Sequence, residues 1–468
     1  MKQVSTNQHA WVIVAASFFS LFLNAGLCYA AGVLHVRLVE TYPQNVYSVA
    51  WLGSILVSLT ALAGPVASLV INLYDCRTCA VLAGILGFIG FVGSYFAPNL
   101  PSLFVTYALI VGLGLGLSNT SSVVILGYYF KEDTSVAAGI TVTGGGLGMF
   151  VYPVLTDFLL ETYGLRGTFL ILGGVVFQSC VCGMLMRPSE FEHSRREMFL
   201  SGQNRRQLVI HAISGGDYTQ CCSILTNIPF LLLVFSYFTV SLATSSLYLY
   251  LPDYFVQRGA SLQTASFSLS VSGIGSIVSR LTTGFAANDP RIGSILLLAG
   301  MTGLIGVLAL FINLFSVTSA GQLSYGFLLG LYTGGLWVVS GPSALSLLGV
   351  ERLATGFGLL MLSIGLGYLV GPPLAGLVFQ ASNQHSSLFL FCAAMCFTAT
   401  VCTFLTAVAG SGSDKLVKDS MSQKQTDIDV DVVCNDVDAS FHLENGFCVD
   451  VDKPHFVPEE EKLVLEKT

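Results

Sequence analysis

One arginine lies inside an otherwise apolar stretch of the chain. Arg280 is near the middle of residues 267–285, with apolar or small neighbours on both sides. An arginine keeps its proton in proteins, and its charge is costly in hydrocarbon, so it must face a polar cavity or a partner. Its planar fork of N–H groups can hold a carboxylate with two hydrogen bonds. The sequence therefore predicts that Arg280 anchors a carboxylate.

The alternative role for Arg280 is a structural ion pair with an acidic side chain. No Asp or Glu lies deep in any apolar run, and the nearest candidates, Asp157 and Asp253, are toward the ends of theirs. Because charges inside a membrane are by default functional, the binding role is favoured. Asp157 and Asp253 are instead candidates for proton-accepting acids near an outer mouth.

Polar and aromatic side chains within the apolar runs are candidates for lining a cargo cavity. Each has an alternative role, because Tyr and Trp also gather at membrane interfaces, and Ser or Asn also bonds a neighbouring helix. The candidates are Asn24, Tyr29, Asn119, Tyr152, Tyr248, Ser276, Tyr332 and Trp337.

The composition identifies the environment of these residues. The 468 residues are 53% apolar and only 10% charged, whereas about a quarter of an ordinary soluble domain is charged. This excludes a cytosolic enzyme, a nucleic-acid binder and a disordered protein. Residues 410–468 differ, since they hold 14 Asp or Glu against 6 Lys. They predict a disordered acidic tail.

The apolar runs predict an all-α membrane protein with twelve transmembrane helices. Each run approaches or exceeds the roughly 20 residues that a membrane-spanning helix needs, and none shows the short alternating pattern of barrel strands. The runs are 10–34, 46–71, 79–97, 102–130, 135–160, 167–186, 228–252, 262–287, 292–315, 320–349, 354–380 and 387–409.

The distribution of positive charge predicts the orientation and the domains. With the amino terminus inside, ten Lys or Arg residues before the tail fall on inner segments and three on outer loops, which places both termini in the cytosol. The longest gap, residues 187–227, predicts a solvated cytosolic linker. The predicted parts are a cytosolic amino terminus (1–9), two six-helix bundles (10–186 and 228–409), the linker between them and the tail (410–468).

Two short patterns repeat between the predicted bundles. Asp75-Cys-Arg77 returns as Asp289-Pro-Arg291, 214 residues later, and Gly146-Leu-Gly148 returns as Gly365-Leu-Gly367, 219 residues later. Each pattern therefore recurs six predicted helices later in the chain. The shared offset indicates two duplicated bundles of like orientation, an architecture in which transporters rock two halves about a central site.

Several of these stretches resemble the major facilitator superfamily and, within it, the monocarboxylate transporter family. The inner-loop stretch is Asn72-Leu-Tyr-Asp75-Cys-Arg77, and the best-matching stretch begins Leu165-Arg166-Gly167 and runs to Met186-Arg187-Pro188. Further matches are Tyr129-Phe130 with Ala138-Gly139 and Gly144, and Gly371-Pro372-Pro373-Leu-Ala-Gly376. The resemblance implies that Asp75, Arg77, Asp289 and Arg291 latch the halves when the cavity faces outward.

The chain also departs from the family pattern. Family members that move lactate with a proton carry a Lys in the first helix and an Asp–Arg pair in the eighth. Here Tyr29 and Ser276 occupy the Lys and Asp positions, while Arg280 is retained. The resemblance favours proton symport, whereas the absence of a deep acid favours uncoupled transport or exchange, so proton linkage stays open.

The sequence as a whole predicts a plasma-membrane secondary transporter for a small carboxylate-bearing molecule. Alternatives are an uncoupled facilitator of another cargo, such as an aromatic amino acid, an iodothyronine or creatine, and a membrane receptor without transport. The resemblance implies a single-span immunoglobulin-type glycoprotein as a partner, besides the lipid bilayer. No enzyme, cofactor, nucleic-acid partner or metal site is expected, because the sequence lacks a buried Ser–His–acid or ligand cluster and Cys76-x-x-Cys79 lacks a second ligand pair.

Overall fold

The computed structural model describes residues 2–42, 46–130, 133–194, 224, 226–289, 291–382, 384 and 386–409. All of them belong to the unit that spans Met1–Gly410. The predicted acidic tail and residues 195–223 of the predicted linker lie outside the described residues, as does the side chain of Tyr29.

The first half of the chain is helical over each of its six predicted runs. Several runs consist of more than one helical segment, and the first helix begins at Lys2, eight residues before the predicted start at residue 10. The segments are α1 (Lys2–Ala25), α2 (Leu27–Thr41), α3 (Val46–Leu62), α4 (Gly64–Leu73), α5 (Cys76–Phe96), α6 (Leu100–Leu103), the π-helical η2 (Phe104–Val111), α7 (Gly112–Tyr129), α8 (Thr134–Phe177) and α9 (Ser179–Leu185).

One glycine divides α8 into the two spans that the sequence predicts. Gly164 has φ +64° and ψ −179°, a non-helical backbone in the middle of the 44-residue element. Glycine adopts positive φ at little cost because it has no Cβ. The break falls in the gap between the predicted runs 135–160 and 167–186, and α8 therefore contains two helices joined at Gly164.

The second half is also helical over each of its six predicted runs. Its segments are α13 (Ile228–Gln257), α14 (Leu262–Ala286), α15 (Ser294–Leu310), α16 (Ile312–Phe315), α17 (Ser319–Leu348), α18 (Leu353–Ser382) and a last helix, Ser386–Ala409. Side-chain caps explain where three of them begin: Asn227, Ser261 and Thr318 accept hydrogen bonds from backbone N–H groups of α13, α14 and α17. Such caps satisfy donors that have no partner inside the helix.

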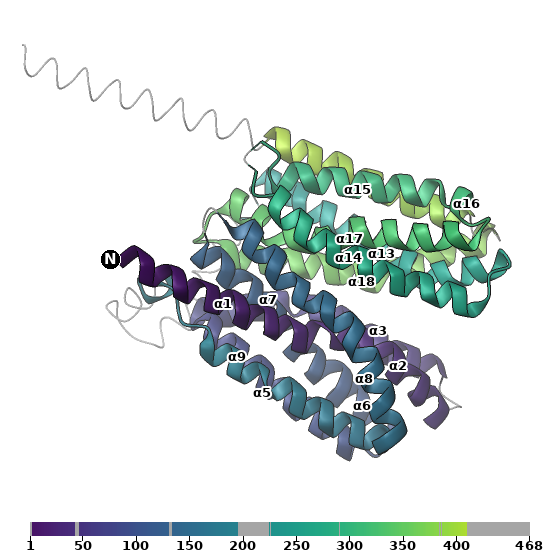
Figure 1. Ribbon diagram of the computed structural model, residues 1–468, viewed down its shortest axis with the longest axis horizontal. Helices are drawn as coiled ribbons and strands as arrows, with labels where there is room; N and C mark the ends of the chain where they lie inside the picture. Colours follow the sequence, from purple (N-terminus) through teal and green to yellow (C-terminus); the bar gives the residue numbers. More distant parts are fainter. Residues whose placement is uncertain are drawn as a thin grey trace, which may run out of the picture. The chain divides into compact units, whose positions relative to one another are not determined.

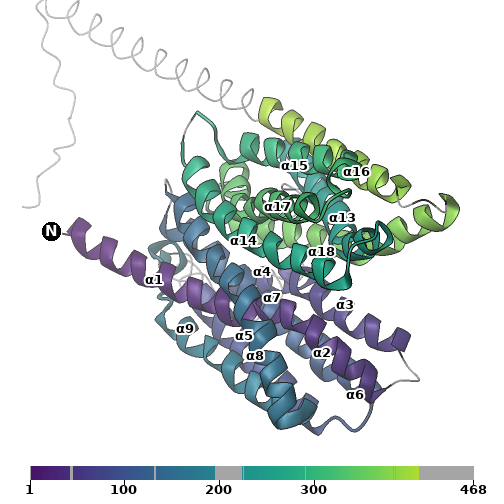
Figure 2. The same ribbon diagram turned by 45° about the vertical axis from the view of Figure 1, so that its right-hand side comes forward.

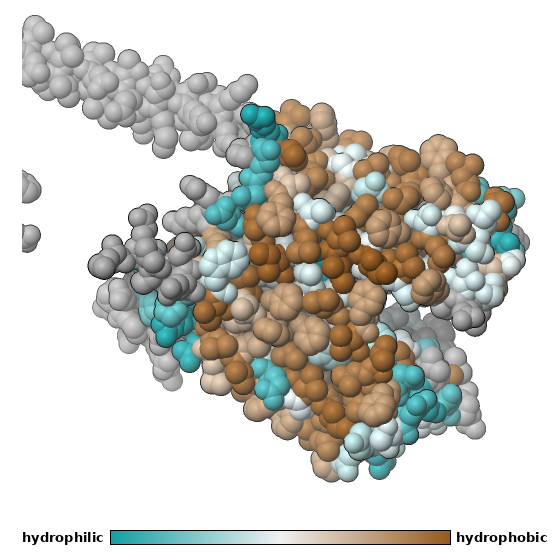
Figure 3. Space-filling model, in the orientation of Figure 1, coloured by the Kyte–Doolittle hydropathy of each residue, from teal (hydrophilic) through white to brown (hydrophobic). Residues whose placement is uncertain are grey.

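The two halves form two groups of helices that lie side by side. Figures 1 and 2 show α1–α9 in one group and α13–α18 in the other. Eight helices of the described residues are long and apolar enough to cross a membrane. Figure 3 shows apolar side chains over the middle of the helices and polar ones near their ends, the pattern expected where lipid surrounds the helices.

A ridge of glycines on α17 packs against a ridge of serines on α14. A Cβ atom at Gly334 would lie 2.6 Å from the Ser276 carbonyl oxygen, and Cβ atoms at Gly326 and Gly330 would meet the carbonyl oxygens of Ser268 and Ser272. Small residues spaced four apart let the backbones of two helices approach closely. This contact holds α14, the helix that carries Arg280, against α17.

Candidate functional site

The predicted carboxylate anchor is buried where the two halves meet. The Arg280 residue on α14 is 5% exposed, and its Nη1 donates a 2.8 Å hydrogen bond to the carbonyl oxygen of Val142 on α8. Its Nε is buried without a hydrogen-bond partner. A buried donor without a partner costs free energy, so this side chain has an unused N–H group that an acceptor would stabilise.

The face of α8 opposite Arg280 presents Gly139, Val142 and Gly146, each about one turn from the next. A Cβ atom at Gly139 would lie 2.9 Å from the Arg280 carbonyl oxygen, and one at Gly146 would lie 3.0 Å from Arg280 Nη1. The two backbones therefore approach closely at Gly139, whereas at Gly146 the side chains of Arg280 and Ile277 lie where a Cβ atom would be in tight contact with them.

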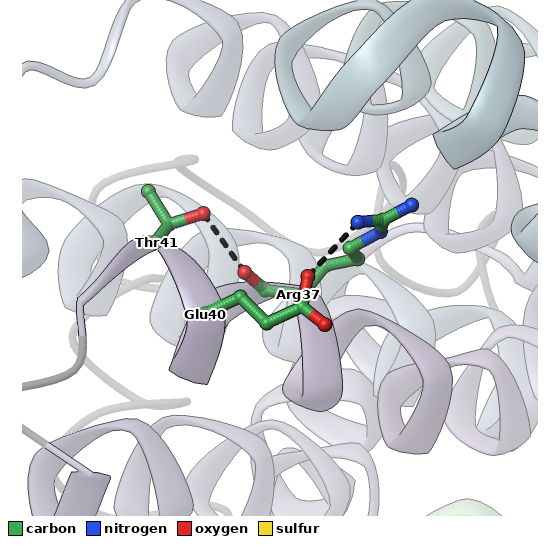
Figure 4. Close-up of polar contacts among 3 residues, drawn as sticks. All are labelled: Arg37, Glu40 and Thr41. Atoms are coloured by element: carbon green, nitrogen blue, oxygen red, sulfur yellow. Dashed lines mark hydrogen bonds and ion pairs between the residues drawn. The ribbon is translucent and has the colours of Figure 1, made fainter.

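Arg280 has no acidic partner in the part of the chain that the structure describes. Within that part the single ion pair joins Arg37 to Glu40 on α2, at 2.9 Å, with Thr41 bonded to the Arg37 carbonyl (Figure 4). The only other buried charged residues among those described are Asp75 and Glu192, and both bond to backbone N–H groups. The charge of Arg280 is therefore not neutralised by a described side chain.

Two of the other predicted cargo residues lie at informative positions. Asn24 is buried; its Nδ2 donates to the Ser20 carbonyl, but its Oδ1 has no partner. Asn119 on α7 reaches the other half, with Nδ2 3.8 Å from Met361 Sδ on α18. Asn24 thus resembles Arg280 in carrying a buried polar atom without a hydrogen-bond partner.

The remaining predicted cargo residues pack between helices. The Tyr152 hydroxyl donates to the Leu23 carbonyl, Ser276 lies against Gly334, and Trp337 stands 6.3 Å from the Tyr368 ring. Two more are half-buried: Tyr248, whose hydroxyl is 2.7 Å from that of Thr333, and Tyr332. Their cargo contacts stay predictions, because packing also accounts for these positions.

The predicted outer-mouth acids and latch residues lie at the surface or in loops. Asp157 and Asp253 are exposed, as are Arg77, Asp289 and Arg291. Asp75 caps α5 by accepting from Thr78 N–H, and Asp289 accepts from Arg291 N–H. None of the four latch residues bonds to the other half in the described structure, so their predicted latching is not seen in this conformation.

Other residues, which the sequence analysis did not single out, join the halves. Near the ends where residues 187–227 connect them, here called the linker side, Asn72 donates to Thr355 at 2.8 Å and Asn288 donates to Asp133 at 3.0 Å. Beside these bonds the helices cross at glycines, where a Cβ at Gly64 would lie 2.6 Å from the Gly358 carbonyl oxygen and one at Gly139 would lie 2.8 Å from Gly284 Cα. The halves are therefore in close contact on the linker side.

The beginning of the predicted linker is packed against the first half of the chain. Glu192 is 2% exposed. One carboxylate oxygen accepts from the Cys76 N–H at 2.8 Å, and the other accepts from the Ser189 N–H at 2.7 Å and from the Ser189 hydroxyl at 3.0 Å. The spacing Ser-x-x-Glu is that of a capping box, a signal present in the sequence.

Replacing Glu192 by Ala is expected to destabilise the protein by about 1–3 kcal/mol, because the buried N–H groups of Cys76 and Ser189 lose a charged acceptor. Thermal unfolding of the purified protein in detergent measures the change. Glu190→Ala is the matched control, since Glu190 is exposed two residues away. Equal melting temperatures for the two variants would contradict the role assigned to Glu192.

The sequence relatives are membrane transporters. The family model of the Major Facilitator Superfamily matches residues 10–330. Monocarboxylate transporter 12 of Xenopus laevis is 28% identical over 417 residues, covering 85% of this chain and 88% of that protein. Human monocarboxylate transporter 14 is 29% identical over 449 residues, covering 82% and 87%. The resemblance to the monocarboxylate transporter family is confirmed by these relatives.

The solved structures confirm the predicted fold class. The Escherichia coli fucose:proton symporter FucP superposes with a TM-score of 0.65 at 14% identity, covering 84% of this chain and 98% of that one. At this identity the likeness concerns the fold alone. Together with the family match, it confirms the all-α membrane architecture of twelve helices in two bundles.

Proposed function

The chain belongs to the Major Facilitator Superfamily, and from this premise we propose that it moves a small carboxylate-bearing organic molecule across the plasma membrane. In such transporters two bundles rock about a site between them. Arg280 and Val142 face each other across the halves, where a cargo would contact both. The protein is a transporter and not an enzyme.

One observation carries the choice of a carboxylate. The Arg280 guanidinium is buried, has no acidic partner among the described residues and leaves its Nε without an acceptor. A cation on a membrane helix costs about 2.5–3.5 kcal/mol or more, and a carboxylate is the ligand that repays this cost with charge-assisted hydrogen bonds. The names of the relatives, monocarboxylate transporters 12 and 14, support the same class of cargo.

We propose further that transport proceeds without an obligatory proton. A proton relay inside the membrane generally needs a buried Asp, Glu or His. Among the described residues the buried acids are Asp75 and Glu192, which are bonded to helix N-termini, and no described histidine is buried. Asp157 and Asp253 are exposed, so neither is a buried relay.

Uptake into proteoliposomes tests both proposals. The purified protein is reconstituted and offered labelled aliphatic, 2-oxo and aromatic monocarboxylates, each compared with its neutral primary amide. We expect saturable uptake of at least one carboxylate and uptake of its amide about 100-fold lower, the factor typical of losing a charge-assisted contact of about 3 kcal/mol. Empty liposomes provide the background.

The same vesicles separate coupled from uncoupled transport. We expect uptake to stop when the cargo concentrations inside and outside the vesicles are equal, both with an inward proton gradient and without one. Concentrative uptake that needs the gradient would overturn uncoupled transport and leave the carboxylate assignment standing. Equal uptake of each carboxylate and its amide would overturn the carboxylate assignment itself. Saturable binding of a carboxylate without flux would favour the receptor alternative and overturn transport.

A further inference from the structure

We propose that Gly146 is a positioning residue of the carboxylate site, and this inference rests on the proposed function. Its missing side chain forms the slot in α8 that receives the Arg280 guanidinium. A Cβ atom at this position would lie 3.0 Å from Arg280 Nη1 and 3.6 Å from its Cδ. Gly146 thus sets how far the cation can reach toward Val142 and, from there, toward a cargo.

The neighbouring glycines of α8 are small for a different reason. A Cβ atom at Gly144 would meet the Phe18 carbonyl oxygen first, and one at Gly139 would meet Gly284 Cα first. At Gly148 the first atoms are Gly26 Cα and the Phe22 carbonyl oxygen. These glycines let the backbones of two helices touch. At Gly146 no backbone atom of another helix is among the nearest, which are side-chain atoms of Arg280 and Ile277.

The internal repeat shows the same contrast. Gly365 occupies in α18 the place that Gly146 occupies in α8, and it too faces a helix of the other half. A Cβ atom there would lie 2.7 Å from both the backbone nitrogen and the Cγ of Leu62. The second half therefore needs a glycine for close backbone approach, whereas the first half uses the equivalent glycine to accommodate a cation.

A methyl group at position 146 would displace the guanidinium by a few tenths of an ångström. A side chain binds its ligand with full effect only when it is held within about 0.5 Å of the position that the bound state requires. The Nη1 bond to the Val142 carbonyl, now 2.8 Å, fixes that position. Displacement would weaken carboxylate binding while leaving the charge, the helix and the rocking of the halves in place.

Carboxylate uptake by Gly146→Ala tests the inference. We expect the half-saturating concentration to rise about tenfold or more, since a charge-assisted hydrogen bond contributes a factor of this size, with a maximal rate within about twofold of the original. Gly174→Ala is the matched control on the same helical element, because a Cβ there meets nothing within 4 Å. Alanine favours helix over glycine, so neither variant should lose thermal stability.

A double variant separates positioning from packing. Ile277→Ala removes the Cγ1 atom that lies 3.0 Å from a Cβ at 146, but leaves the contact with Arg280. If Gly146 positions the cation, Gly146→Ala/Ile277→Ala keeps the raised half-saturating concentration. Full recovery in the double variant, or an unchanged half-saturating concentration in Gly146→Ala, would overturn the inference. Neither result would contradict the proposed function, which is tested separately by the uptake of carboxylates against their amides and by Arg280→Gln.

Discussion

Replacing Arg280 by Gln is expected to lower carboxylate uptake by at least about 100-fold while the protein remains folded. Glutamine removes the charge that attracts the carboxylate, and losing one partner of a buried charged pair costs about 2–5 kcal/mol. Arg280→Lys keeps the charge without the planar fork and should retain part of the activity. Initial rates of labelled carboxylate uptake, normalised to the amount of protein in the vesicles, measure both effects.

Thermal stability distinguishes a carboxylate-binding role of Arg280 from a role in stabilising the fold. Because the charge of Arg280 has no acidic partner among the described residues, removing it should leave the melting temperature unchanged or raise it. Arg37→Gln is the matched control: Arg37 is exposed and paired with Glu40, so its uptake should stay near normal. An Arg280→Gln protein that unfolds more easily, or that transports normally, would contradict the anchor role.

Replacing Gly330 by Val is expected to destabilise the protein by about 3 kcal/mol or more. A Cβ at Gly330 would collide with the carbonyl oxygen, carbonyl carbon and Cα of Ser272, and overpacking of this kind forces backbone shifts that cost about 1–3 kcal/mol, occasionally more. The variant should yield little monodisperse protein in detergent and melt at a lower temperature.

Two further variants test whether the backbone collision causes the destabilisation expected for Gly330→Val. Gly300→Val, on α15, should change stability little, because a Cβ atom at that position meets nothing within 4 Å. Shortening Ser272 to Gly should fail to rescue Gly330→Val, because the atoms in the way belong to the backbone. Rescue by Ser272→Gly would show that the collision lies in the side chain and would refute the close α14–α17 contact as its cause.

The helices could be predicted from the sequence because a membrane imposes a simple condition. A segment of about 20 apolar residues must bond its backbone internally and therefore forms a helix, whatever surrounds it. Each of the predicted runs is helical in the described residues. Irregularities inside a run, such as the π-helical segment η2, were not predicted, since they depend on how neighbouring helices pack.

Arg280 could also be singled out from the sequence, because one charge in an apolar run is costly wherever the fold places it. Its surroundings could not. The Val142 carbonyl is a backbone atom, and no residue type reports which carbonyl faces a guanidinium. Gly146 belongs to a repeated motif, but the motif alone does not separate a glycine that accommodates a side chain from one that lets two backbones touch.

The local chemistry of the chain thus determines the helix content, the number of spans and the presence of one buried cation. The reason is that exposing a peptide group or a charge to hydrocarbon is unfavourable at each residue, whatever the rest of the fold. The hydrogen bond from Arg280 to the Val142 carbonyl, the linker-side contacts of Asn72 and Asn288 and the burial of Glu192 were decided by the tertiary structure. These features depend on which helices become neighbours and at what height they cross, and that is set by packing between residues more than a hundred positions apart in the chain.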